Sequence, residues 1–153
     1  MLHFGYGSNL RAAFVMELLP SAKLLMKAYL PNYEVQWPVW SDTFRGGTSS
    51  IVETPGELVE GVLYDCPEQE LRELDYKPGL YIPSYKRETF MVLGEDGDWH
   101  RAELYRLRTL SGPFPPSRSY VEGMLSGGKE LGLSPPYIEK IEGWLRQSIA
   151  AGL

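Results

Sequence analysis

The chain has 153 residues, of which 43% are hydrophobic and 23% are charged. This length and balance predict one folded domain over residues 1–153 and exclude a disordered chain, which would bury too little apolar surface. The net charge of −5, with lysine and arginine scattered along the chain, argues against nucleic acid or an anionic membrane as a partner.

Cysteine and histidine are scarce. Cys66 is the single cysteine, so no disulfide can form within the chain, and we expect a reducing, cytoplasmic location. His3 and His100 have no His or Cys neighbour at ligand spacing, so we expect no metal and no cofactor. Neither a signal segment nor an apolar run of about 18 residues is found, so we expect neither secretion nor a membrane span.

The N-terminal segment predicts a strand, a tight polar turn and the start of a helix. An apolar run at residues 2–4 is followed by the string Tyr6, Gly7, Ser8, Asn9 and Leu10. Gly7 allows a sharp turn and a close approach of the backbone to a ligand. Ser8 or Asn9 can cap the helix, whose first N–H groups lack partners within the helix and favour a carboxylate or phosphate. We therefore expect a carboxylate-binding turn here, although a plain strand-to-helix turn has the same pattern.

The middle of the chain predicts short strands separated by turns. The strands are expected at residues 23–29, 34–37, 51–52 and 58–64. Residues 38–47 read as a loop, and Thr54-Pro55-Gly56 reads as a turn between the last two strands. A helix is expected from Pro67, because proline suits the first helical position and acidic residues fill the first turn.

The second half predicts a β-hairpin followed by two helices. Residues 85–93 and 99–107 flank an Asp-Gly pair that suits a tight turn. Ser117 is expected to cap a helix that ends at Gly127-Gly128, and a last helix is expected to begin at Ser134. Strands that come early, with helices mainly at the end, indicate an α+β architecture.

The Tyr-Gly-Ser-Asn-Leu string resembles the hallmark of the γ-glutamylcyclotransferase-like family, and the resemblance continues in family order over residues 2–145. The other matching segments are residues 46–51, residues 54–64, Leu74-Asp75 with Gly79, Tyr85 with Arg87, Pro116-Ser117 with Tyr120, and residues 128–137. The resemblance implies a closed or nearly closed barrel-like mixed sheet with flanking helices and a ligand cavity at one end. It is also compatible with a homodimer and with a role in glutathione-related metabolism.

The resemblance further implies a reaction on a small γ-glutamyl or amino-acid-derived ligand. In the family's reaction the α-amine of a γ-glutamyl group attacks the γ-carbonyl, which releases 5-oxoproline and a free amine. The turn from Tyr6 to Leu10 would hold the α-carboxylate, and one carboxylate side chain would move the proton. Tyr85 and Tyr120 match positions that line the family's cavity. They could donate to a carbonyl oxygen or could be half-buried aromatic residues at the end of the sheet.

One position departs from the family pattern. The family places its catalytic glutamate just before the glycine that matches Gly79, and here that position holds Pro78, which cannot carry a proton. We therefore expect a cyclotransferase that is slow or acts on a modified substrate, with a catalytically inactive binding or regulatory module as the alternative. A changed reaction that does not need this base is a third possibility. The acids that could substitute are Glu53, Glu57, Glu73, Asp75 and Glu88, while Arg87 could pair with a substrate carboxylate or with an internal acid.

Overall fold

The computed structural model describes residues 1–76, 85–107 and 110–153, and it has the expected α+β architecture. Five strands form a closed barrel in the order β1-β3-β2-β4-β5. The strands are β1 (Leu2–Gly5), β2 (Lys23–Ser41), β3 (Gly46–Asp65), β4 (Lys86–Gly94) and β5 (Trp99–Arg106). The helices are η1 (Ser8–Leu10, a 3₁₀ turn), α1 (Ala12–Leu18), α2 (Glu68–Leu74), α3 (Arg118–Leu131) and α4 (Pro135–Ala150).

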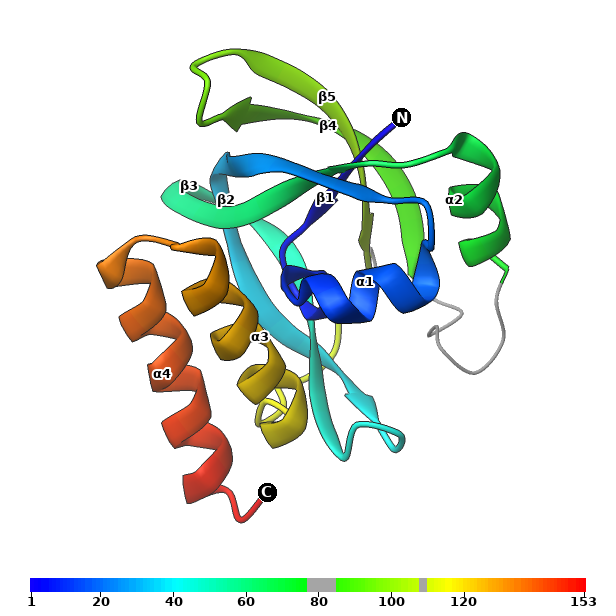
Figure 1. The fold of residues 1–153 in the computed structure, drawn as a ribbon. Helices are drawn as coiled ribbons and strands as arrows, with labels where there is room; N and C mark the ends of the chain where they lie inside the picture. Colours follow the sequence, from blue (N-terminus) through cyan, green and yellow to red (C-terminus); the bar gives the residue numbers. More distant parts are fainter. Residues whose placement is uncertain (77–84, 108–109) are drawn as a thin grey trace.

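The short strand β1 closes the barrel. It pairs antiparallel with β3 along its length and parallel with β5 where His3 lies opposite Glu103. The helices α3 and α4 lie side by side on one flank of the barrel, while α1 crosses its front and α2 lies near the opposite flank (Figure 1). Because the turn after β1 leads into η1 and α1, the place where the barrel closes is also the place where the polar turn begins.

The expected short strands merge into two long ones. Residues 23–29 and 34–37 are two halves of β2, and residues 51–52 and 58–64 both belong to β3. The turn predicted at residues 54–56 is therefore wrong. The ladder steps from Tyr33 opposite Glu53 to Pro31 opposite Leu58, so the extra residues of β3 bulge outward without ending the strand.

An irregularity in β2 opposite this bulge explains why β2 and β3 remain paired on both sides of it. Asn32 has a φ of 65°, and its side-chain oxygen accepts a hydrogen bond of 3.0 Å from the N–H of Gly56. The loop predicted at residues 38–47 is also too long. Val39 already pairs with Thr48 and Ser41 with Gly46, so four residues, 42–45, connect the strands.

The second half follows the sequence closely, with one exception. The hairpin β4–β5 forms as predicted, and Ser117 and Ser134 cap α3 and α4 by accepting hydrogen bonds from the N–H groups of Tyr120 and Tyr137. However, α3 does not end at Gly127-Gly128. It continues to Leu131, and Gly132, with a φ of 74°, provides its C-cap.

Gly127 has a packing role instead of a terminating one. A methyl group at this position would lie 2.7 Å from the carbonyl carbon of Leu10 and 2.9 Å from the nitrogen of Arg11. The absence of a side chain at Gly127 therefore allows α3 to lie directly against the backbone of the turn after β1.

We predict that Gly127→Ala destabilises the protein, because the added methyl forces α3 away from the backbone of Leu10. The expected loss is about 1–3 kcal/mol of unfolding free energy, as for other overpacked sites. Gly123→Ala is the matched control in the same helix, because its nearest neighbour would be the Arg11 side chain at 3.9 Å. That control should gain about 0.5–1 kcal/mol from helix propensity. Urea denaturation measures both, and equal stability of the two variants would contradict the close packing.

Candidate functional site

A cavity of about 100 Å³ lies beside the turn that follows β1. Its wall has a polar side, formed by the turn and by hydroxyl groups, and an apolar side contributed mainly by α1, α2 and the β2–β3 connection. The polar lining residues include Tyr6, Ser8, Asn9, Thr48, Ser49, Tyr85 and Tyr120, and the apolar ones include Phe14, Leu18, Phe44 and Leu74.

Six of the seven residues that the sequence proposes for the site line this cavity. They are Tyr6, Gly7, Ser8, Asn9, Tyr85 and Tyr120. The seventh, Leu10, is fully buried in the hydrophobic core and does not line the cavity. The reason is that the η1 turn directs its side chain inward while its backbone supports α3.

The turn is held by hydroxyl groups from elements far away in the sequence. The N–H of Ser8 donates to the hydroxyl of Tyr120 at 3.0 Å, and that hydroxyl lies 2.8 Å from Oγ of Ser49. A methyl group at Gly7 would lie 2.5 Å from both the Ser49 and the Tyr120 oxygens. Gly7 is therefore required by this close approach of two side chains to the backbone, and not by a left-handed conformation, since its φ is −114°.

The helix-capping prediction for Ser8 and Asn9 is wrong. Both residues belong to the 3₁₀ turn η1, which ends before α1; the N-cap of α1 is Arg11, and no side chain caps that helix. The 3₁₀ turn uses its own backbone, because the N–H of Leu10 donates to the oxygen of Gly7 at 3.0 Å and that of Arg11 donates to Ser8 at 3.2 Å. The polar character of the site therefore comes from the hydroxyl cluster around the turn more than from a helix end.

The Asn9 side chain instead reaches His3, a contact that sequence reasoning missed. Nδ1 of His3 lies 3.0 Å from the backbone oxygen of Glu103, which can only accept, so Nδ1 carries the proton. Nε2 is then an acceptor, and the Asn9 amide nitrogen donates to it at 2.7 Å. The backbone oxygen of Asn9 accepts from the Tyr64 hydroxyl at 2.8 Å, and the Tyr64 ring stacks on His3. The six-residue separation of His3 and Asn9 gives no periodic signal, because one lies in a strand and the other in a turn.

The three tyrosines of the proposed site have their hydroxyl groups in hydrogen bonds. That of Tyr6 donates to the backbone oxygen of Tyr105 at 2.5 Å, and burial raises the pKa of this phenol well above its usual value. The Tyr85 hydroxyl donates to the backbone oxygen of Ser49 and lies 3.2 Å from Oγ1 of Thr48. Together with Tyr120 they place neutral phenol groups along the cavity wall.

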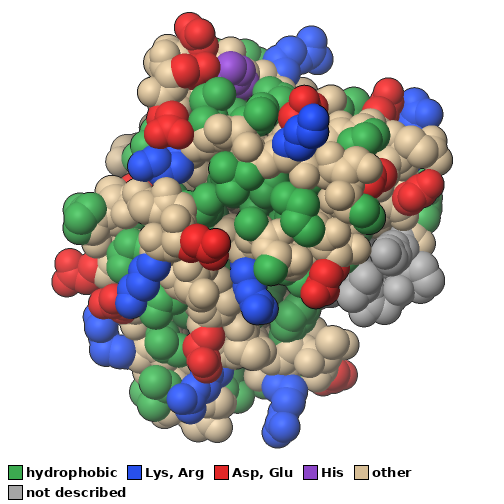
Figure 2. All heavy atoms as spheres, in the orientation of Figure 1, with side chains coloured by type: hydrophobic (Ala, Val, Ile, Leu, Met, Phe, Trp, Pro, Cys, Tyr) green, Lys and Arg blue, Asp and Glu red, His purple; other side chains and the backbone are tan. Residues whose placement is uncertain are grey.

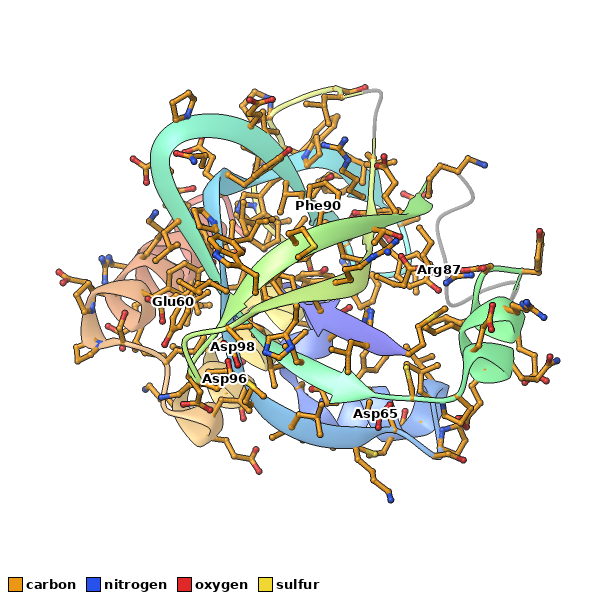
Figure 3. The ribbon with its side chains drawn as sticks, turned by 90° about the horizontal axis from the view of Figure 1, so that it is seen from above. Glu60, Asp65, Arg87, Phe90, Asp96 and Asp98 are labelled. Carbon is orange, nitrogen blue, oxygen red and sulfur yellow. The ribbon has the colours of Figure 1, made fainter. Side chains whose placement is uncertain are left out.

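A charged cluster lies one side chain away from the cavity. Arg87 binds the Asp75 carboxylate with Nε at 3.0 Å and Nη2 at 2.9 Å, and its Nη1 lies 3.1 Å from Glu103. Figure 3 shows Arg87 near the start of β4, beside α2. Asp75 also accepts a hydrogen bond of 2.7 Å from the hydroxyl of Tyr105, a cavity-lining residue. Of the two partners expected for Arg87, the structure therefore has the internal acid.

Three of the other candidate acids form contacts away from the cavity lining. Glu88 pairs with Arg106 at 2.5 Å, Glu57 with Lys140 at 3.4 Å, and Glu73 accepts from Gln69 at 3.3 Å. Glu53 lies opposite Tyr33 in the β2–β3 ladder. Among these acids Asp75 is thus the one with a described hydrogen bond to the cavity wall. Pro78, which the sequence analysis expects at the position of the family glutamate, lies outside the described residues.

The described residues contain no group of three or more His, Cys, Asp or Glu side chains that could hold a metal ion. Over the same parts of the chain, each helix is too short or too polar to span a bilayer. Acidic and basic side chains are interspersed on the face seen in Figure 2. Burial raises the pKa of the Cys66 thiol to about 11, which makes it a poor nucleophile.

Known proteins resemble this chain over most of its length. It is 30% identical over 145 residues to a human protein named gamma-glutamylcyclotransferase, covering 92% of this chain and 77% of the human one. It is 29% identical over 144 residues to the bovine protein of that name, covering 92% of this chain and 76% of the bovine one. A solved structure described as gamma-glutamyl cyclotransferase matches with a TM-score of 0.85 at 29% identity, covering 93% of this chain and 86% of the other.

The closed barrel with its flanking helices is therefore the γ-glutamylcyclotransferase fold. The sequence pattern of the AIG2-like family matches residues 58–141. The chain thus belongs to this AIG2-like, γ-glutamylcyclotransferase-like family, which confirms the resemblance found in its motifs.

We predict that stability falls as the pH is lowered from 6.5 to 4 because of His3. Burial lowers the pKa of its imidazole from 6.5 to about 4, so in this window the unfolded chain binds the proton that the folded protein excludes. The loss across the window is about 3 kcal/mol, from about 1.4 kcal/mol for each unit of pKa.

Urea denaturation at several pH values measures this loss. His3→Phe should lack this contribution to the pH dependence, whereas His100→Gln, which alters the surface hairpin and keeps His3, should retain it. The same pH dependence in His3→Phe and in the wild type would contradict the assignment.

Proposed function

We propose that this protein binds a γ-glutamyl compound in the cavity beside the turn and cyclises it slowly, releasing 5-oxoproline and an amine. The observation that carries this proposal is the cavity itself, because the polar turn, Tyr85 and Tyr120 meet around it. The kinship with proteins named gamma-glutamylcyclotransferase supports the same reaction class.

The hydroxyl cluster suits the oxygen atoms of such a ligand. When Ser49 donates to the Tyr120 oxygen, which also accepts from the Ser8 N–H, the Tyr120 proton is free to be donated into the cavity. Directed at the γ-carbonyl oxygen, this donor would stabilise the charge that develops as the amine attacks. A well-placed donor of this kind contributes about 3 kcal/mol to lowering the barrier.

Proton transfer is assigned to Tyr105 and Asp75 together. Tyr105 lines the cavity and its hydroxyl donates to Asp75, so a proton from the ligand's α-ammonium can pass to the Tyr105 oxygen as the phenol proton passes to Asp75. The amine then forms the bond to the γ-carbon, the first proton returns by the same path to the leaving nitrogen as its bond to the γ-carbon breaks, and the ring nitrogen releases its second proton to solvent to give the lactam. Asp75 does not line the cavity and is already paired with Arg87 at 2.9 Å, so the proton must pass through Tyr105 to reach it, which makes the turnover slow.

A purely binding role is the second candidate. It is favoured by the composition of the cavity wall, because none of the described lining residues is Asp or Glu. A ligand would then be held by neutral hydroxyl and amide groups without a carboxylate in direct contact.

We predict slow release of 5-oxoproline when the pure protein is incubated with a panel of γ-glutamyl amides and γ-glutamyl amino acids. Loss of a directly placed base should make turnover about 10² to 10⁴ times slower than in an enzyme that has one. Chromatographic detection of 5-oxoproline measures the rate, and thermal shift with the same compounds measures binding. Binding without release would favour the binding module. The absence of both binding and release would contradict the proposed function.

We predict that Tyr105→Phe and Asp75→Asn each lower kcat about 100-fold with a smaller change in KM, because proton transfer typically contributes at least that much. Tyr105→Phe is the cleaner variant because it leaves the pairing of Asp75 with Arg87 in place. Glu57→Gln is the control, since it removes an acid that pairs with Lys140 and does not line the cavity. Pro78→Glu, which restores the family acid, should raise kcat. Full activity of Tyr105→Phe would rule out this proton path.

A further inference from the structure

The side-chain amide of Asn9 can take two orientations, and His3 selects one of them. Rotating the amide by half a turn exchanges an acceptor oxygen for a donor nitrogen. Because Nε2 of His3 carries no proton, it accepts from the amide nitrogen, and the amide oxygen is directed away from His3. In the opposite orientation two acceptors would face each other across a buried contact.

We propose that His3 is a positioning residue, which holds the Asn9 amide with its oxygen as the acceptor for the ligand's α-ammonium group. This rests on the proposed function, in which the ligand is a γ-glutamyl compound. His3 and Asn9 both line the cavity. Within the described parts of the chain, the side-chain oxygen of Asn9 accepts no hydrogen bond, so it is available to a ligand.

The composition of the cavity explains why an oriented amide matters there. None of the described lining residues is Asp, Glu, Lys or Arg, so a bound ammonium group must be recognised by neutral oxygen atoms. A buried cation without such acceptors is strongly disfavoured. An amide turned the other way would present N–H groups to the ammonium and repel it. The orientation of Asn9 therefore determines which charge this part of the wall accepts.

The surroundings of His3 keep this orientation fixed. The ring is 1% exposed and is held by the backbone of Glu103, at the point where β1 and β5 close the barrel. The hydroxyl of Tyr64 holds the backbone oxygen of Asn9 at 2.8 Å, so the amide and the ring cannot easily separate. Burial also keeps the imidazole neutral, with a pKa of about 4, and a neutral ring is what the orientation requires.

The test compares L-glutamine with glutaramate, which differ only in the α-ammonium group. Calorimetry should show that the wild-type protein prefers L-glutamine by about 10-fold or more, the usual contribution of a hydrogen bond to a charged group. His3→Phe should reduce this preference toward equality. His3→Gln should retain most of it, because a glutamine amide can donate to Glu103 and accept from Asn9. His100→Gln is the control and should bind both compounds as the wild type does.

The outcomes distinguish a failure of the proposed function from a failure of the positioning role of His3. If the wild type binds neither compound, the proposed function fails and this inference fails with it. If both compounds bind but His3→Phe keeps the preference, or weakens the two compounds equally, the function stands and the role of His3 is rejected. Nitrogen NMR of the wild-type ring gives an answer even if His3→Phe does not fold. A proton on Nδ1 with none on Nε2 is expected, and a protonated Nε2 would overturn the inference.

Discussion

The hydrogen bonds of His3 connect the architecture of this protein to its candidate site. The barrel closes where β1 meets β5, at His3 and Glu103, and the same imidazole donates to the Glu103 backbone and accepts from Asn9. A strand of four residues thereby fixes both the last pairing of the barrel and the first polar turn after it. Because the ring is buried and neutral, Nδ1 is a donor and Nε2 is an acceptor. Both hydrogen bonds hold the turn firmly against the sheet.

The site separates neutral groups from charged ones. Hydroxyl and amide groups face the cavity, whereas the carboxylates of Asp75 and Glu103 lie behind it, both paired with Arg87. Tyr105 is the connection between the two layers, since it lines the cavity and donates to Asp75. In this arrangement neutral polar groups line the cavity, and the nearest acid lies one side chain farther away.

The polar turn also depends on helices that come last in the chain. Tyr120, at the start of α3, accepts from the Ser8 N–H and lies 2.8 Å from Oγ of Ser49 at the centre of the hydroxyl cluster, and Gly127 in the same helix allows the close contact with Leu10. The Ser117 cap fixes where that helix begins and so where Tyr120 lies. The site is therefore assembled from both ends of the sequence, and the packing of α3 against the turn is a condition for its shape.

The sequence by itself determined the features that depend on local chemistry. The caps at Ser117 and Ser134, the hairpin β4–β5 and the family motif at Tyr6 to Leu10 all follow from neighbouring residues. Tertiary structure decided the rest, because the cause lay in a distant part of the chain. The strands β2 and β3 continue where the sequence predicts turns, because the Asn32 side chain accepts a hydrogen bond from Gly56 across the ladder. Asn9 binds His3 instead of capping a helix, Leu10 belongs to the core, and Asp75 reaches the cavity through Tyr105. Hydrogen bonds and packing between remote segments outweighed local preference at each of these positions.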